Sequence, residues 1–197
     1  PLLNKYLSYV ALSTGDADLA DAAISRAKTC LDAKSRTDLM HFFYVRSQAA
    51  LLRGNLTEAR ACVGTHLSAT PDSSMLFGVA IVHIDSAGVF VESGEYAEAE
   101  AQLQKAECIA RRIRTGMLPP QLDLVRAHMA IRQGRPADAA GPLHRALAVM
   151  RACGYVVWNP TMRPQLASII AGAALELGIE REFVLDAIRC RRLQPEH

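Results

Sequence analysis

The chain has 197 residues, of which 50% are hydrophobic and 21% are charged. This composition supplies ample apolar material for a core and argues against an intrinsically disordered segment. The formal net charge is only +2, so charge gives no case for binding to nucleic acid or to a membrane surface. Because the chain starts at Pro1 with no charged-then-apolar leader, we expect a piece of a longer, cytoplasmic protein.

The cysteines are scattered along the chain, and no two of them form a CxxC pair. An odd and scattered set predicts neither a disulfide framework nor a zinc site. We interpret them as small apolar residues in a reducing cytoplasm. They are Cys30, Cys62, Cys108, Cys153 and Cys190.

Four pairs of helices are predicted, and a glycine separates the two helices of each pair. Breakers rich in turn-forming residues separate the pairs: ATPDSS at 69–74, TGMLPP at 115–120 and GYVVWNP at 154–160. YVVW in the third breaker is interpreted as a connector, because no strand-like alternation of useful length appears. In chain order, the pairs are expected at Leu2–Thr14 and Asp16–Ala33, Leu39–Arg53 and Asn55–Ser68, Leu76–Ser93 and Glu95–Arg114, and Gln121–Gln133 and Arg135–Ala152.

The longest apolar stretch, Met75–Val91, belongs to one of these helices. It contains His83 and Asp85, and it is shorter than the roughly 20 apolar residues that a membrane span needs. We therefore expect a buried helix there.

The four glycines mark a repeat. They lie 39, 40 and 40 residues apart, and a fixed period in this range is typical of a helical solenoid. An alanine follows each glycine by five residues, an apolar residue follows it by nine, and a small residue precedes it by seven. The glycines are Gly15, Gly54, Gly94 and Gly134, the alanines Ala20, Ala59, Ala99 and Ala139, the apolar residues Ile24, Val63, Leu103 and Leu143, and the small residues Ser8, Ser47, Ala87 and Ala127.

Each class of repeated residue has a physical reason. Glycine tolerates a positive φ and can turn the chain tightly between two helices. Small residues on the two flanking helices let an antiparallel pair approach closely, and the apolar residue fills the seam between them. Each unit is therefore predicted to be a helix, a tight turn and a second helix.

These positions resemble the tetratricopeptide repeat (TPR), and the best copy is GEYAEAEAQLQKA, from Gly94, with Tyr96 at the favoured aromatic position. The units are several residues longer than the standard 34. A degenerate last unit, with Phe183 where an alanine is expected after Gly178, is typical of a cap. The resemblance implies an all-α fold: a TPR-like right-handed superhelix (α-solenoid) of antiparallel helix pairs, in a single domain 1–197. About five units are expected, at about 1–38, 39–75, 76–118, 119–157 and 158–197.

The C-terminal segment is similar to the segment that closes the repeat domain of large bacterial transcription regulators. These are the MalT-like, LuxR-type regulators and relatives that carry a bacterial transcriptional activator domain. The similarity rests on Trp158, Pro160, ALELGIE and FVLDAIRCRRLQP. It implies a sensor and oligomerisation domain that is joined to a nucleotide-binding switch ATPase and to a separate DNA-binding domain.

No motif of enzyme or metal chemistry appears: the sequence has no phosphate loop, HExxH, GxSxG or Cys/His cluster. His83 and Asp85 are two residues apart on a predicted helix and point in different directions, so His83 is interpreted as structural. The basic runs Arg111–Arg114 and Arg189–Arg192 end helices, where cations suit the negative terminus, and are interpreted as caps rather than nucleic-acid contacts. We expect no catalytic residue, no cofactor and no metal.

The first helix of each pair is expected to line the inner, concave wall of the superhelix, where repeat proteins usually bind. The non-core positions of these helices form a polar and aromatic lining that suits a peptide or a small polar effector. The alternative is that these residues are solvated or make contacts between repeats. The candidate binding residues are Lys5, Tyr9, His41, Tyr44, Gln48, Asp85, Gln121, His128 and Arg132.

The sequence thus favours a non-catalytic effector-sensing or protein-interaction domain of a bacterial transcriptional regulator. Its expected partners are a small-molecule or peptide effector in the groove, the switch ATPase and DNA-binding domains of the parent regulator, and a possible second copy in a homo-oligomer. No direct contact with nucleic acid or membrane is expected. One alternative is a generic TPR protein-binding scaffold without a transcriptional role. Another is an enzyme, which would need a buried, charge-perturbing constellation in the groove.

Overall fold

The computed structural model describes residues 2–32, 34–69, 76–159 and 162–194, with the backbone alone in 2–6. The described chain is all helical and contains no strand in these ranges. The helices are α1 (Leu2–Thr14), α2 (Ala17–Thr29), α3 (Arg36–Leu52), α4 (Leu56–Ala69), α5 (Leu76–Glu92), α6 (Tyr96–Ile113), α7 (Leu118–Arg132), the 3-10 helix η1 (Pro136–Ala139), α8 (Ala140–Ala152), α9 (Pro164–Glu176) and α10 (Arg181–Arg191).

Glycines end the first helix of each pair, as the repeat predicts. Gly15, Gly54, Gly94 and Gly134 have φ between 70° and 78°, a conformation that costs glycine little. The amide of the next residue reaches back to the helix: the N–H of Glu95, for example, donates to the carbonyl oxygen of Phe90 at 2.9 Å. This is the bond pattern of the Schellman motif, and it satisfies carbonyl groups that the helix end would otherwise leave unpaired.

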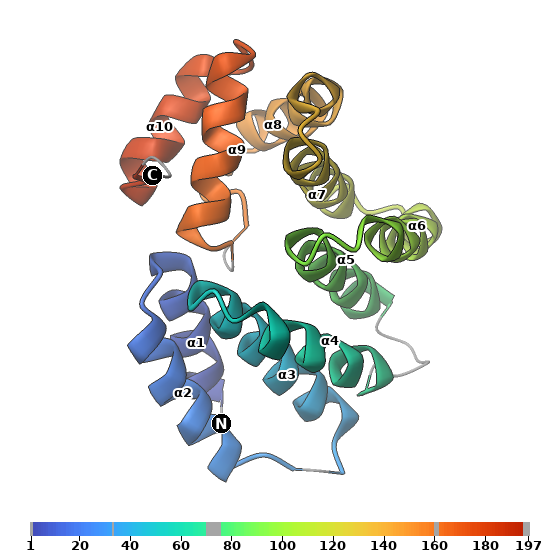
Figure 1. Ribbon diagram of the computed structural model, residues 1–197, viewed down its shortest axis with the longest axis vertical. Helices are drawn as coiled ribbons and strands as arrows, with labels where there is room; N and C mark the ends of the chain where they lie inside the picture. Colours follow the sequence, from blue (N-terminus) through green and yellow to red (C-terminus); the bar gives the residue numbers. More distant parts are fainter. Residues whose placement is uncertain (1, 33, 70–75, 160–161, 195–197) are drawn as a thin grey trace.

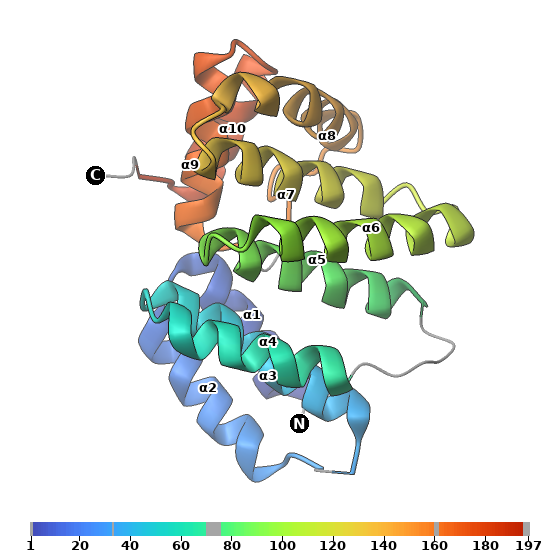
Figure 2. The same ribbon diagram turned by 45° about the vertical axis from the view of Figure 1, so that its right-hand side comes forward.

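The helices pack as antiparallel pairs, and the pairs stack on one another (Figures 1 and 2). Within the pairs, α1 packs against α2, α3 against α4, α5 against α6, α7 against α8 and α9 against α10. The first helices also contact each other in sequence, from α1 through α3, α5 and α7 to α9. The stack is curved, and α5, α7 and α9 lie on the inside of the curve with α6, α8 and α10 outside them.

The repeated small residues lie where two helices meet. The alanines five residues after the glycines (Ala20, Ala59, Ala99 and Ala139) are fully buried, and the small residues seven before the glycines are buried as well. Larger side chains at these positions would hold the paired helices apart. Leu103 and Leu143 fill the seam and have no exposed surface.

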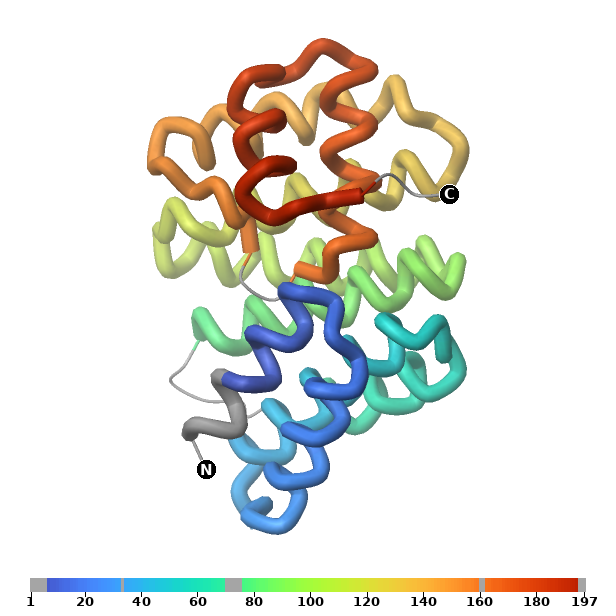
Figure 3. Tube along the Cα trace, turned by 90° about the vertical axis from the view of Figure 1, so that its left-hand side faces the viewer, coloured from blue at the N-terminus to red at the C-terminus, as the bar shows by residue number. Residues whose placement is uncertain are grey.

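The curvature brings the first and last pairs together. Gly15, in the turn between α1 and α2, lies so close to α9 that a Cβ atom added to it would be 3.1 Å from Cγ of Pro164 (Figure 3). The inner side of the stack is therefore closed by α9, and this closure decides how much space the candidate site has.

Four predicted boundaries were wrong by a few residues. Helix α2 ends at Thr29 and not at Ala33, and the amide of Cys30 donates to the carbonyl oxygen of Ala27 at 3.1 Å in its last turn. Helix α3 begins at Arg36 because Ser35 accepts a hydrogen bond from the amide of Asp38 as an N-cap. Helix α7 begins at Leu118, inside the predicted breaker, because prolines fit the first turn, where their missing N–H is not needed. Pro136 begins a short 3-10 turn ahead of α8. Part of the predicted breakers, 70–74 and Pro160, lies outside the described residues, as does Ala33.

In the ranges described, no helix has both the length and the apolar character of a membrane-crossing segment.

Candidate binding site

A small cavity lies on the inner side of the stack, between α3, α5, α7 and the start of α9. Its volume of about 50 Å³ has room for one or two water molecules, since each takes up roughly 30 Å³ in the liquid. Its wall combines apolar and polar side chains. The polar ones are Tyr44, Gln48, Asp85, Gln121, His128, Asn159 and Arg163, and the apolar ones include Leu51, Ile84, Leu124, Met162, Leu166 and Ile170.

Each helix contributes one stripe of residues to this wall. Residues three and four apart lie on the same face of an α-helix, which places Tyr44 with Gln48, and Asp85 with Gly88. Gly88 is one repeat away from both Gln48 and His128, but it carries no side chain. A Cβ atom added to Gly88 would meet nothing within 4 Å, so the missing side chain leaves part of the cavity open.

Asp85 faces this cavity without a partner. Its carboxyl group makes no hydrogen bond or ion pair within the described parts of the chain, and neither does the Gln48 amide. Burial raises the pKa of Asp85 to about 8, because an ionised carboxylate there would lose its hydration. Asp85 is therefore mostly protonated at neutral pH and presents both a hydrogen-bond donor and an acceptor to the cavity.

Glu92 holds one end of the cavity together. Its carboxylate accepts a hydrogen bond from Nη2 of Arg163 at 2.6 Å, lies 3.0 Å from Nη2 of Arg132, and lies 3.5 Å from Nε2 of His128. Burial alone would raise the pKa of Glu92, but the attraction of these neighbours outweighs it and the pKa is lowered. The cluster joins α5, α7 and the residue that precedes α9, and so it fixes α9 over the inner side.

His128 is neutral in this cluster. Burial lowers its pKa to about 4, although the charge of Glu92 acts in the opposite direction. Its Nε2 accepts a hydrogen bond from Nε of Arg132 at 3.2 Å, which assigns the proton to Nδ1. That Nδ1 is buried and has no partner in the described ranges. The same holds for Nε of Arg163, whose residue is only 7% exposed.

The remaining polar wall is held by the connection into α9. Nε2 of Gln121 donates to the carbonyl oxygen of Trp158 at 3.0 Å, and Oε1 of Gln121 accepts from Nδ2 of Asn159 at 3.1 Å. Trp158 is fully buried and has φ of 60°, an unusual conformation for a non-glycine residue. The Gln121 side chain is therefore fixed, whereas Gln48 and Asp85 still have hydrogen-bonding capacity.

Among the nine candidate binding residues, Tyr44, Gln48, Asp85, Gln121 and His128 line this one cavity. Arg132 does not line the cavity itself, but it pairs with Glu92 and donates a hydrogen bond to His128.

Tyr9 and His41 lie to one side of it. The Tyr9 hydroxyl is 3.3 Å from Nδ1 of His41, and the Tyr9 ring meets the Tyr44 ring edge-on. His41 borders a second small cavity between α1, α2 and α3. The side chain of Lys5 lies outside the described residues.

Besides the apolar residues of the wall, four residues of the site were not among the candidates: Gly88, Glu92, Asn159 and Arg163. The repeat carries a signal for Glu92, because it stands two residues before Gly94 just as Arg132 stands two before Gly134. Opposite charges at equivalent positions of stacked helices predict an ion pair. Asn159 and Arg163 come from an irregular connector, where no periodicity assigns a direction to a side chain.

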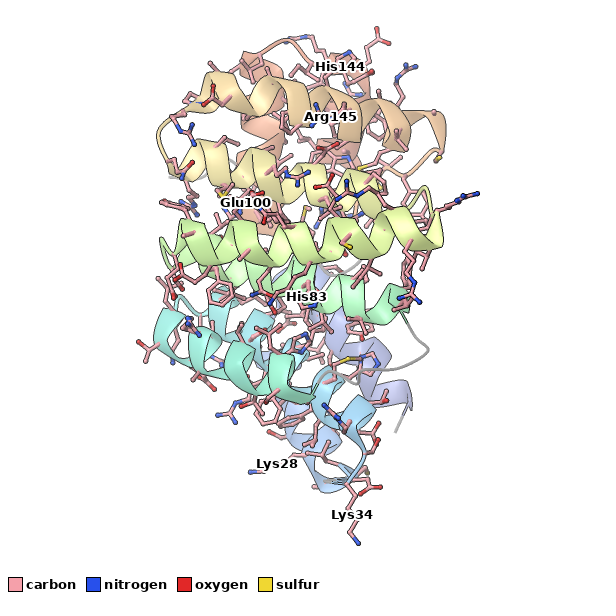
Figure 4. All side chains as sticks on the ribbon, turned by 90° about the vertical axis from the view of Figure 1, so that its right-hand side faces the viewer. Lys28, Lys34, His83, Glu100, His144 and Arg145 are labelled. Atoms are coloured by element: carbon pink, nitrogen blue, oxygen red, sulfur yellow. The ribbon has the colours of Figure 1, made fainter. Side chains whose placement is uncertain are left out.

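The interpretation of His83 as structural agrees with its contacts. Nδ1 of His83 lies 2.8 Å from Oε1 of Gln102, on the side of α5 that faces α6 (Figure 4). Burial lowers the pKa of His83. Nowhere in the described ranges do three His, Cys, Asp or Glu residues come together in a group that could hold a metal ion.

One basic run also has a structural role. Nη2 of Arg191 donates to the carbonyl oxygen of Met162 at 2.6 Å, and its Nη1 donates to that of Val157 at 3.3 Å. Arg189 pairs with Asp186 one turn earlier on α10. These contacts tie α10 to the connector that precedes α9.

Comparisons of the chain with protein-family models, with curated proteins and with solved structures found no match.

Proposed function

We propose that the chain is a non-catalytic, TPR-like helical repeat domain that binds a small polar molecule in the central cavity. The observation that carries this proposal is the pair Gln48 and Asp85. Both present polar groups without a hydrogen-bond partner in the described chain to a partly open cavity that is built by four helices. Solvent reaches both groups, so a bound molecule with matching donors and acceptors could replace the water there and pair with them.

The size of the cavity favours a small molecule over a peptide. An extended peptide needs an open groove, whereas here α9 is held over the inner side by the Arg163–Glu92 ion pair and by the contact of Pro164 with Gly15. A volume of about 50 Å³ suits a ligand of a few non-hydrogen atoms. A larger ligand would have to move α9 away from α1 and α5.

That requirement gives the domain a means of sensing. A ligand that binds only when α9 is displaced would favour the open packing, and its effect is limited by its difference in affinity for the two packings. Within the parent protein, such a shift would change the contacts of α9 and α10 with neighbouring domains. We therefore propose that this is the cytoplasmic sensing domain of a bacterial transcriptional regulator of the MalT-like, LuxR-type class.

One surface feature supports the alternative of a protein-binding scaffold. A further, shallow cavity of about 280 Å³ lies between the start of α7 and the end of α8, and its lining is largely apolar. Met117, Val149 and Tyr155 are exposed around it. Exposed apolar clusters of this kind mark protein contact sites, so this surface would carry the scaffold function.

A thermal-shift screen with a cavity-filling variant tests the first proposal. The ligands are ethanol and acetamide as neutral probes, acetate as an anion and ethylammonium as a cation. Gly88→Leu places a side chain in the cavity, and Gly64→Leu is the matched control because Gly64 is an exposed glycine inside α4, also with open space at its Cβ. A ligand that binds only the folded state raises Tm, by an amount that grows with its concentration.

We expect at least one probe to raise Tm of the unaltered protein and of Gly64→Leu but not of Gly88→Leu. If no probe raises Tm, or if Gly88→Leu responds like the control, the central cavity is not the binding site. The regulator role has a separate test: the parent sequence should encode a switch ATPase or a DNA-binding domain beside this chain.

A further inference from the structure

Asp85 differs from the other charged residues around the cavity in having no counter-charge. The two arginines nearby, Arg132 and Arg163, are both committed to Glu92. Burial is the sole cause of the raised pKa of Asp85, and no cation acts against it. Of the residues that line the cavity, Asp85 is the one acidic side chain. Its charge, when it forms, therefore has no counter-charge in the cavity wall, and a cation that enters the cavity would supply one.

The groups that face Asp85 from the surrounding elements are suited to a cation. Helix α3 presents the ring of Tyr44 and the Gln48 amide, whose oxygen can accept an N–H. An aromatic ring also attracts an ammonium group that approaches its face. Helix α7 presents His128, which stays neutral because burial lowers its pKa to about 4. The one cation in the wall is Arg163, at the start of α9, and Glu92 neutralises it.

Charge separates the three possible classes of ligand. An anion would lie beside Asp85 and would have no cation to pair with, because both arginines already pair with Glu92. A neutral molecule would bind while Asp85 stays protonated. A primary ammonium ion would meet a carboxylate, an amide oxygen and an aromatic ring, and would relieve the cost of ionising a buried acid.

We propose that the central cavity selects a small primary ammonium ion and that Asp85 is the residue that binds it. The proposal rests on the proposed function, namely that this cavity is the binding site. In the free protein the carboxyl group is protonated. On binding, the carboxyl proton leaves to solvent and the resulting carboxylate pairs with the ammonium group, so one cation enters as one proton departs. The cavity volume of about 50 Å³ limits the ligand to a few non-hydrogen atoms, a size that ethylammonium satisfies.

Isothermal titration calorimetry with ethylammonium tests the assignment. Titrations at pH 7 in two buffers of different ionisation enthalpy measure the protons released. We expect close to one proton per ligand, because Asp85 is mostly protonated in the free protein at that pH. Affinity should rise by up to tenfold per pH unit between pH 6 and pH 7.5. Acetamide is the neutral probe of similar size.

Asp85→Asn is the decisive variant, because it keeps the shape of the side chain and removes its charge. We expect it to weaken ethylammonium binding by roughly 30-fold or more and acetamide binding far less, because the neutral probe forms no ion pair with this side chain. Equal ethylammonium affinity in Asp85→Asn, or binding without proton release, overturns the inference. If acetamide binds and ethylammonium does not, the cavity is a binding site for neutral molecules and only this inference fails. If neither probe binds, this inference fails, and so does the proposed function that makes this cavity the binding site.

Discussion

Replacing Gly88 by alanine is expected to stabilise the protein, although most changes inside a helix bundle do the opposite. Gly88 lies inside α5 without a positive φ, so its helix geometry suits any L-residue. Alanine is more favourable than glycine in a helix interior by about 0.8–1.0 kcal/mol. The added methyl group would enter the cavity and meet no atom within 4 Å, so no overpacking opposes this gain.

The expected gain is about 1 kcal/mol, which corresponds to a rise in Tm of about 2–4 °C for a chain of this length. Urea unfolding followed by circular dichroism at 222 nm measures it. Gly64→Ala is the matched control, since its methyl group is exposed to solvent and reports helix propensity alone. A loss of stability in Gly88→Ala, with a gain in the control, would refute the reasoning, because it would mean that the space above Gly88 is already filled.

Three further predictions concern the turn, the ion cluster and pH. Gly94→Ala should lower the free energy of unfolding by about 1–2 kcal/mol, because φ of 74° strains an alanine; a loss below 0.5 kcal/mol in urea titrations would contradict this. Glu92→Gln should cost about 3 kcal/mol, because it leaves buried Arg163 without a counter-charge, and an unchanged urea midpoint would count against the cluster. His66 and His128 have pKa values lowered to about 4 by burial, so the unfolded chain binds more protons and stability is lost as pH falls from 6.5 towards 4. The raised pKa of Asp85 has the opposite effect, so its contribution to stability is lost as pH rises towards 8. Urea titrations from pH 4.5 to 8.5 should therefore show a maximum of stability near pH 6.5, and a flat profile would exclude this account.

The pairing of helices could be predicted from the sequence because one local requirement repeats. Each glycine that needs a positive φ is followed by an alanine that a close helix contact needs, and both requirements act over a few residues. The ends of helices were harder to predict. Pro119 and Pro120 were interpreted as a breaker, but prolines are also accepted in the first turn of a helix. Whether they break or begin α7 depends on the residue at which the helix starts, which is Leu118.

The shared location of five candidate residues could be predicted, because they lie on the regular helices. Tyr44, Gln48, Asp85, Gln121 and His128 were selected by counting back from the repeat glycines, and the structure brings them to one cavity.

The closure of that cavity could not be predicted in the same way. It depends on Arg163, which follows an irregular connector, and on the curvature that brings Gly15 to Pro164. Curvature is the sum of small rotations between stacked pairs, and no residue pattern reports that sum.

The central claim is that ligands bind on the inner side of the stack and not on its outer surface. Amide chemical-shift mapping by NMR tests it most directly, with ethylammonium and acetamide titrated into the ¹⁵N-labelled protein. The account predicts that the largest shifts occur at Gln48, Asp85, Gly88 and His128 and that Gly88→Leu abolishes them. Shifts confined to the exposed apolar surface around Met117, Val149 and Tyr155, or shifts that persist in Gly88→Leu, would contradict it.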